Sequence, residues 1–255
     1  MKIGFCGPLE RMKEAAEAGF DYLEPTVTSA AGLSEAEFEA CLEGMKKAPL
    51  PTPSFNVLFP GTMELISGKT PEEEIKAYLE SALRRVRLLG GKTVVFGSGR
   101  SRLRPEGLPY DEAFRRLIRV TRLIGDAAQA NGLTIAVEPL NRGETNMINS
   151  VGEGACLAAA ADHPAVKLLA DYYHIAMEGE PPEDLLRVGG ICHAHIATRE
   201  GRRAPVQPED GFRRMFSAMK KSGYQGLLSV EGRVDDMAAE GAASVRMLKA
   251  LWEEA

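Results

Sequence analysis

Short apolar segments alternate with longer segments of mixed polarity along the whole chain. The apolar segments are rich in valine, isoleucine and leucine, and TVVF, TIAV and KLLA are almost entirely apolar. This pattern is typical of strands that are buried on both faces of a parallel sheet. Strands are predicted at residues 2–6, 21–27, 53–59, 92–98, 133–139, 166–171, 190–197 and 227–232.

The segments between these strands have the spacing of amphipathic helices. The clearest helices are predicted at residues 72–89, 110–131, 212–222 and 236–253. Thr70 and Pro71 precede the first of them, which predicts an N-cap at Thr70 and a proline at the first helical position. Gly90, Gly132 and Gly223 follow three of the helices, and a glycine there is a signal for a helix C-terminus.

Strands that alternate with helices predict a parallel sheet covered by helices. About eight such units in 255 residues fit a closed (β/α)8 TIM barrel, with residues 1–255 forming a single domain. The alternative is a doubly wound open sheet. That fold would favour a GxGxxG turn after an early strand, and the sequence has no such turn.

Composition and charge narrow the function classes. Hydrophobic residues make up 44% of the chain and the net charge is −5, so the chain has no bulk attraction for nucleic acid or anionic membranes. No apolar run is long enough for a membrane span, and the first residues lack the apolar core of a signal peptide. The four cysteines are scattered without a CxxC pair, which predicts reduced thiols in a cytoplasmic protein.

Four late strands carry residues that can bind a metal. Glu138, Asp171 and Glu231 close three of these strands, and the fourth contains His193 and His195. Catalytic groups of barrel enzymes lie at the C-terminal ends of the strands, and charged groups there are costly unless they are paired or bound to a metal. Because side chains alternate along a strand, the four residues are expected to meet at the mouth of the barrel if the small or polar set faces the axis.

One histidine and three carboxylates suit Mn²⁺, Mg²⁺ or Co²⁺ better than a structural Zn²⁺ site. The alternative interpretation is that each carboxylate only caps the loop or helix that follows it. His193 has two interpretations of equal weight, a supporting residue of the site or a hydrogen-bonded histidine of the core.

Four motifs carry a resemblance to a known family. They are EPLNRGETN from Glu138, DYYH from Asp171, HAHIA from His193 and SVEG from Ser229. In the order and spacing of these motifs, the chain resembles the xylose isomerase-like TIM barrel superfamily. Within that superfamily it resembles the ketose 3-epimerases of the D-tagatose/D-psicose type. The resemblance implies one divalent metal ion, with Mn²⁺ as the first choice and Mg²⁺, Co²⁺ or Zn²⁺ as alternatives. The implied metal ligands are Glu138, Asp171, His195 and Glu231.

The resemblance further implies how the substrate is held. His174 and Arg202 would each bind a substrate oxygen, and Arg203 is placed equally well for the second role. Glu144 would contact the terminal hydroxyl or support His174. The substrate would be a small sugar or sugar phosphate. Relatives often pair as dimers, so a homodimer is compatible with the resemblance, while the sequence itself leaves the oligomeric state open.

The implied reaction is proton transfer beside a carbonyl group. Glu138 and Glu231 would act as the acid/base pair on opposite faces of the substrate, and a divalent ion would stabilise the enediolate. Return of the proton on the opposite face inverts the carbon, which makes ketose 3-epimerisation the expected activity. Return to the adjacent carbon would instead be aldose–ketose isomerisation.

Three rival functions are compatible with this fold. A dehydratase or lyase acting on a keto-inositol or a 3-keto sugar could use the same metal and bases. A repair nuclease would need three metals and more than the four histidines present here. A non-enzymatic sugar-binding barrel would predict a degraded ligand set, and all four ligands are present.

The loop after the fourth strand departs from the family pattern. FGSGRSRLRPEG, from Phe96, lacks the aromatic residue that usually covers the sugar. Its glycines together with Arg100 and Arg102 could bind an anion such as a phosphate, and the alternative is a solvated loop with surface arginines. The early strands are expected to line the pocket with Phe5, Cys6, Glu24, Phe55 and Asn56.

Overall fold

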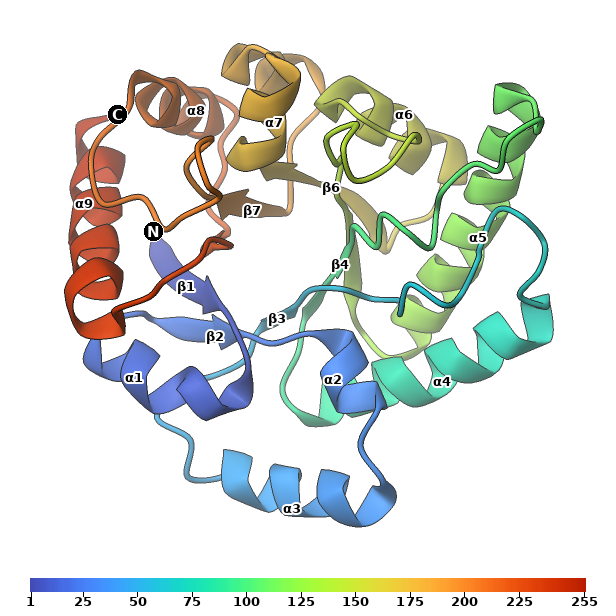
Figure 1. Cartoon of the computed structure of the whole chain (residues 1–255), viewed down its shortest axis with the longest axis horizontal. Helices are drawn as coiled ribbons and strands as arrows, with labels where there is room; N and C mark the ends of the chain where they lie inside the picture. Colours follow the sequence, from blue (N-terminus) through green and yellow to red (C-terminus); the bar gives the residue numbers. More distant parts are fainter.

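The computed structural model describes all residues, 1–255, and contains eight parallel strands surrounded by helices (Figure 1). The strands pair in the order β2-β1-β8-β7-β6-β5-β4-β3. Their bounds are β1 (Lys2–Cys6), β2 (Tyr22–Glu24), β3 (Ser54–Phe55), β4 (Thr93–Phe96), β5 (Thr134–Val137), β6 (Val166–Asp171), β7 (His193–Ile196) and β8 (Leu227–Val230).

The two outer strands of this order, β2 and β3, meet just beyond their ends. Thr26 and Asn56 form a parallel bridge there. The backbone N–H of Asn56 donates to the carbonyl of Pro25 at 3.0 Å, and the N–H of Val27 donates to the carbonyl of Asn56 at 2.7 Å. The sheet therefore comes round on itself as a nearly closed barrel. The predicted (β/α)8 fold is confirmed, and the open doubly wound alternative is wrong.

The helices form a ring outside the barrel (Figure 1). The predicted helices correspond to α4, α5, α8 and α9, of which the last is preceded by a separate short helix, η3. No helix is both long and apolar enough to cross a membrane. The bounds are η1 (Leu9–Arg11), α1 (Met12–Glu17), α2 (Val27–Ala31), α3 (Glu35–Met45), α4 (Glu72–Leu88), α5 (Tyr110–Ala130), α6 (Val151–Ala161), α7 (Tyr172–Glu178), η2 (Pro182–Arg187), α8 (Asp210–Lys221), η3 (Met237–Gly241) and α9 (Ala242–Glu254).

The start of α4 differs from the prediction. Pro71, not Thr70, is the N-cap residue, and no side chain caps the helix. The hydroxyl of Thr70 instead accepts a hydrogen bond from the backbone N–H of Glu64 at 2.8 Å. Three glutamates in the first turn, beginning with Glu72, complement the positive end of the helix dipole.

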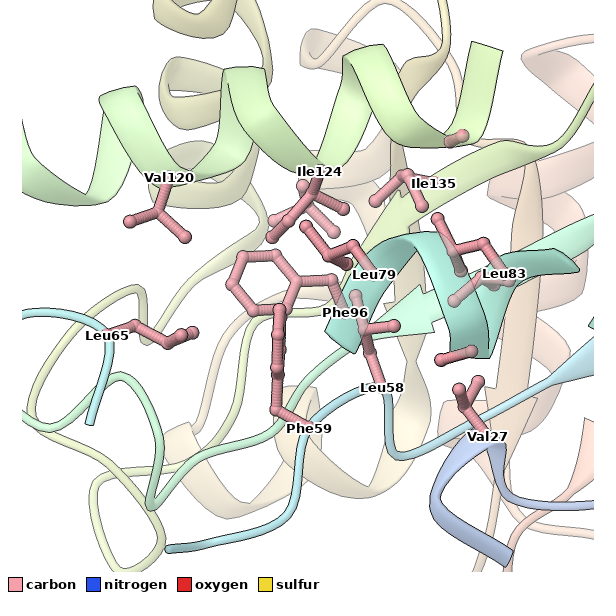
Figure 2. Packing of buried hydrophobic residues seen from close by; sticks show 14 of the residues in the cluster. Val27, Leu58, Phe59, Leu65, Leu79, Leu83, Phe96, Val120, Ile124 and Ile135 are labelled. Atoms are coloured by element: carbon pink, nitrogen blue, oxygen red, sulfur yellow. The ribbon is translucent and has the colours of Figure 1, made fainter. Parts of the chain in front are cut away.

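Apolar residues lie both outside and inside the barrel wall. Figure 2 shows Phe96 of β4 packed among Leu79 of α4 and Ile124 of α5. The neighbouring residue Val95 points the other way and packs inside the barrel with Ala136 and Leu169. This alternation matters for the site, because residues two positions beyond Ala136 and Leu169 also face the barrel axis.

Candidate active site

Glu138, Asp171, His195 and Glu231 lie together at the C-terminal mouth of the barrel. Each offers one ligand atom, and these atoms all lie within 4.8 Å of one another. His195 Nδ1 is 3.3 Å from Glu138 Oε1 and 3.6 Å from Glu231 Oε2. In the strand register, Asp171 is opposite His195 on the neighbouring strand. The structure therefore brings together the four residues that the sequence singled out.

The cluster holds more negative charge than its surroundings balance. Burial, together with the charges of Glu231 and Glu138, raises the pKa of Asp171 to about 8. Burial and Glu231 also raise the pKa of Glu138. Burial alone would raise the pKa of Glu231, but His195 and Arg202 lower it to about 2. Asp171 therefore retains a proton at neutral pH when no cation is present, and a bound cation would favour its charged form.

Asp171 combines a structural contact with a free oxygen. Its Oδ1 accepts a hydrogen bond from the backbone N–H of Tyr173 at 2.8 Å and so caps α7. Its Oδ2 is buried and has no hydrogen-bond partner. Capping therefore explains one oxygen only, and the other is free to bind a cation. Three carboxylates, one of them with this unpaired oxygen, and one imidazole fit a divalent ion that accepts oxygen and nitrogen ligands.

His174 is oriented by Asn141, a residue that the sequence did not single out beyond its place in the motif EPLN. The backbone N–H of Asn141 donates to His174 Nδ1 at 3.0 Å. The other ring nitrogen, Nε2, therefore carries the hydrogen. It lies 3.5 Å from Asp171 Oδ2 and has no hydrogen-bond partner. Burial and the charge of Arg202 lower the pKa of His174 to about 3, so the ring is a neutral donor directed toward the cluster.

Arg202 reaches into the cluster from the loop after β7. Its guanidinium pairs with Glu231, lies 3.8 Å from Asp171 Oδ2 and donates to Glu144 Oε1 at 3.0 Å. Its guanidinium carbon lies 4.6 Å from the ring centroid of Tyr173. Arg202 has a φ of 46°, a left-handed conformation that is uncommon for a non-glycine residue.

Arg203, the alternative to Arg202, faces away from the cluster. It forms ion pairs of 3.0 Å with Asp235 and 2.7 Å with Glu240. Glu144 accepts a second hydrogen bond, from Asn141 Nδ2 at 3.1 Å. Its expected link to His174 is thus indirect and runs through Asn141.

The loop after β4 does not present Arg102 to an anion. Arg102 is fully buried and donates to the backbone carbonyls of Phe96 at 3.1 Å and Glu138 at 2.6 Å. The anion hypothesis is therefore wrong for this residue, because its guanidinium is bound to the ends of β4 and β5. Gly97 in the same loop provides space, since a Cβ there would overlap the Glu138 carboxylate.

Residues from the early strands divide between the site and the outer core. Phe5 and Phe55 pack in the apolar clusters under the helices, so their expected place in the pocket was wrong. Asn56 donates to Glu231 Oε1 at 3.1 Å. Glu24 is fully buried, and its Oε1 lies 2.9 Å from His195 Nε2. Burial alone would raise the pKa of Glu24, but the neighbouring histidines lower it well below its usual range.

His193 does not join the group of four. Its Nε2 lies 2.8 Å from Glu24 Oε2, and its side chain is 1% exposed. His193 is therefore a hydrogen-bonded buried histidine of the core, and it also supports the site because its partner Glu24 contacts His195.

Comparisons with known proteins agree with this architecture. The family described as xylose isomerase-like TIM barrel matches residues 12–251. The 3-dehydro-D-guloside 4-epimerase of Escherichia coli K12 is 26% identical over 61% of this chain and 62% of its own length. A putative hydroxypyruvate isomerase of Streptomyces coelicolor is 26% identical over 89% of this chain and 86% of its own.

A solved D-psicose 3-epimerase, crystallised in the presence of D-fructose, superposes with a TM-score of 0.85 at 18% identity and covers 99% of both chains. At that identity the likeness concerns the fold alone. Alignments with four epimerases span only 41% to 62% of the length of those proteins.

Proposed function

The chain belongs to the xylose isomerase-like TIM barrel family, and on that premise we propose that it is a metal-dependent isomerase of a sugar or sugar phosphate, with ketose 3-epimerisation as its reaction. The observation that carries the proposal is the convergence of Glu138, Asp171, His195 and Glu231, whose ligand atoms lie within 4.8 Å of one another. The names of the related proteins, which are epimerases and isomerases, support the same reaction class.

These four residues are the proposed ligands of one divalent cation, with Mn²⁺ as the first choice. A cation bound there would polarise the carbonyl oxygen of a sugar and make the neighbouring C–H bond more acidic. The unpaired Oδ2 of Asp171 and the excess of buried carboxylates support a cation at this position.

Glu138 and Glu231 are the proposed acid/base pair. One carboxylate removes the proton from the carbon beside the carbonyl, and the other returns a proton on the opposite face, which inverts the carbon. Arg202 and Asn56 both hold Glu231, so the direction of its carboxylate is fixed before substrate arrives. Because the two glutamates interact, the pH profile of the reaction would belong to the pair and not to either residue alone.

Arg202, His174 and Glu144 are the proposed contacts for the other substrate oxygens. His174 offers a hydrogen on Nε2, and Arg202 offers several N–H donors that now engage Glu231 and Glu144. Hydroxyl groups of a sugar can replace some of these contacts, because each hydroxyl both donates and accepts.

Deuterium exchange tests the proposal directly. The protein is stripped with chelator, reloaded with Mn²⁺ and incubated in D₂O with a panel of ketoses and their phosphates, and uptake is followed by NMR. Uptake at C3 with inversion supports a 3-epimerase, and uptake at C1 or C2 with aldose formation supports an aldose–ketose isomerase. Metal-dependent exchange without either product points to a lyase, and failure of the protein to bind any divalent ion contradicts the proposal.

Substitutions then test the roles of the glutamates. Glu138→Gln and Glu231→Gln are each expected to lower the exchange rate by about 10²- to 10⁴-fold, the usual contribution of a general acid or base. Glu240→Gln is the matched control, because Glu240 pairs with Arg203 away from the cluster. Wild-type exchange in either site variant would remove that residue from the mechanism.

A further inference from the structure

Glu24, at the end of β2, is a carboxylate that is fully buried behind His195. It is surrounded by hydrogen-bond donors on both of its oxygens. Oε1 lies 2.9 Å from His195 Nε2, while Oε2 lies 2.8 Å from His193 Nε2, 2.6 Å from Ser54 Oγ and 2.5 Å from Ser229 Oγ. No other side chain in the barrel interior accepts hydrogen bonds from so many partners, and these partners lie on β3, β7 and β8.

The contact to His195 decides which ring nitrogen can bind a cation. A carboxylate accepts hydrogen bonds, so the nitrogen that faces Glu24 must carry a hydrogen. That nitrogen is Nε2, and Nδ1 is the nitrogen that faces Glu138 and Glu231 at 3.3 Å and 3.6 Å. Both ring nitrogens therefore face carboxylates, but only Nδ1 lies on the side of the proposed cation. A cation bound there would take the place of the hydrogen on Nδ1, while Nε2 keeps its hydrogen toward Glu24.

We propose that Glu24 is a positioning residue, which fixes His195 in the tautomer and ring orientation that make Nδ1 a metal ligand. The proposal rests on the proposed metal site. A carboxylate that accepts from the distal N–H of a ligand histidine also increases the basicity of the ligand nitrogen, and loss of such a partner typically weakens metal binding 10- to 100-fold.

Glu24 is itself held in place from the other side. Ser229 donates to Glu24, so the hydroxyl of Tyr22 is the group that donates to Ser229 Oγ, at 2.7 Å. The Tyr22 ring fits inside the barrel wall because residue 4 is a glycine, and a Cβ at Gly4 would overlap that ring. Glu24 therefore cannot rotate away from His195 without breaking a chain of buried hydrogen bonds.

Cys6 lies near the same group, with Sγ 4.0 Å from His195 Nε2. Ligand atoms of Cys6, Glu24 and His195 lie within 4.8 Å of one another, as a second cation site would require. The hydrogen bonds argue against it, because His195 Nε2 faces Glu24 as a donor and both Glu24 oxygens already accept from other groups. The contacts therefore indicate that Glu24 supports the single proposed metal site and does not form a second one.

The test is calorimetric titration of the metal-free protein with Mn²⁺. Glu24→Gln is expected to weaken Mn²⁺ binding by about 10- to 100-fold. The amide of this variant has only one oxygen that can accept a hydrogen bond, and its NH₂ group must face a donor that one of the Glu24 oxygens accepts from in the wild type. Glu240→Gln is the matched control, because it makes the same change in a carboxylate that pairs with Arg203 away from the cluster. Its Mn²⁺ affinity is expected to stay near that of the wild type.

The outcomes separate this proposal from the metal site itself. If the wild type binds no Mn²⁺, the proposed function fails first. If the wild type binds and Glu24→Gln binds equally well, only the role of Glu24 is refuted. Should Glu24→Gln fail to fold, ¹⁵N NMR of histidine in the Zn²⁺-loaded wild type decides. A hydrogen on His195 Nε2 supports the proposal, and a hydrogen on Nδ1 overturns it.

Discussion

Asp171→Asn should separate metal binding from folding more clearly than any other change at this site. Tyr173 N–H needs an acceptor at Oδ1, so the amide nitrogen of the variant is expected to take the place of Oδ2. That position lies 3.5 Å from His174 Nε2 and 3.8 Å from the Arg202 guanidinium, and the nearby charges of Glu138 and Glu231 help to raise the pKa of Asp171 to about 8. An NH₂ group there repels a cation, and it loses the weak attraction of the two donors while it can donate to the carboxylates. The variant should therefore fold with a stability close to that of the metal-free wild type and should lose the metal.

The magnitude follows from the linkage of binding to folding. A ligand at 100 times its Kd stabilises the native state by about 2.7 kcal/mol. In a chain of 255 residues, each kcal/mol shifts Tm by about 2–4 °C. Saturating Mn²⁺ should thus raise the Tm of the wild type by about 5 to 10 °C, and should leave the Tm of Asp171→Asn unchanged.

Thermal unfolding followed by circular dichroism or calorimetry, with chelator and with Mn²⁺, measures both values. Asp235→Asn is the matched control, because Asp235 pairs with Arg203 at the surface and should leave the Mn²⁺ shift intact. A full Mn²⁺ shift in Asp171→Asn would refute the argument that this carboxylate is a ligand. A large loss of stability in the metal-free variant would refute the argument that its charge is unfavourable there.

Three further predictions concern pH, the substrate and the space around the site. The pKa of Asp171 is raised to about 8 in the folded protein and is about 3.9 in an unfolded chain. Between these values the folded state holds the extra proton, so the stability of the metal-free protein should fall as pH rises from about 4 to about 8. Urea titrations should find that this loss of stability with pH is smaller in Asp171→Asn. Arg202→Lys should lower kcat/KM by roughly 10- to 100-fold through the loss of a charged hydrogen bond worth about 1.5–3 kcal/mol, and unchanged kinetics would exclude Arg202 from substrate binding. Gly97→Ala should weaken Mn²⁺ binding by at least about tenfold, because the new methyl group displaces the Glu138 carboxylate. The control is Gly44→Ala, which has open space at its Cβ and should bind Mn²⁺ like the wild type.

The four-residue cluster was predictable because each residue lies on a strand or directly after one. Strand alternation fixes which side chains face the barrel axis, and parallel strands bring their C-terminal ends to one mouth. Glu138 and Asp171 therefore converge for reasons that are visible in the sequence. The prediction for Phe5 and Phe55 was wrong because it rested only on their positions near strand ends, which do not by themselves say which face a residue occupies.

The residues around the cluster required the folded chain. Arg202 and Arg203 are neighbours in a loop, and only the folded structure shows that Arg202 contacts the cluster while Arg203 pairs with Asp235 and Glu240. Arg102 resembled a surface arginine, but the loop turns it back onto the carbonyl of Glu138.

Glu24 illustrates the difference between what sequence and structure decide. The sequence by itself determined the alternation of eight strands with helices and the four polar residues at or near the strand ends, because hydrophobic period and strand direction are local properties. The partner of His195 is 171 residues away in the chain and meets it only when β2 and β7 enclose the same interior. Hydrogen bonds across a barrel depend on its closure, and closure is a property of the tertiary structure.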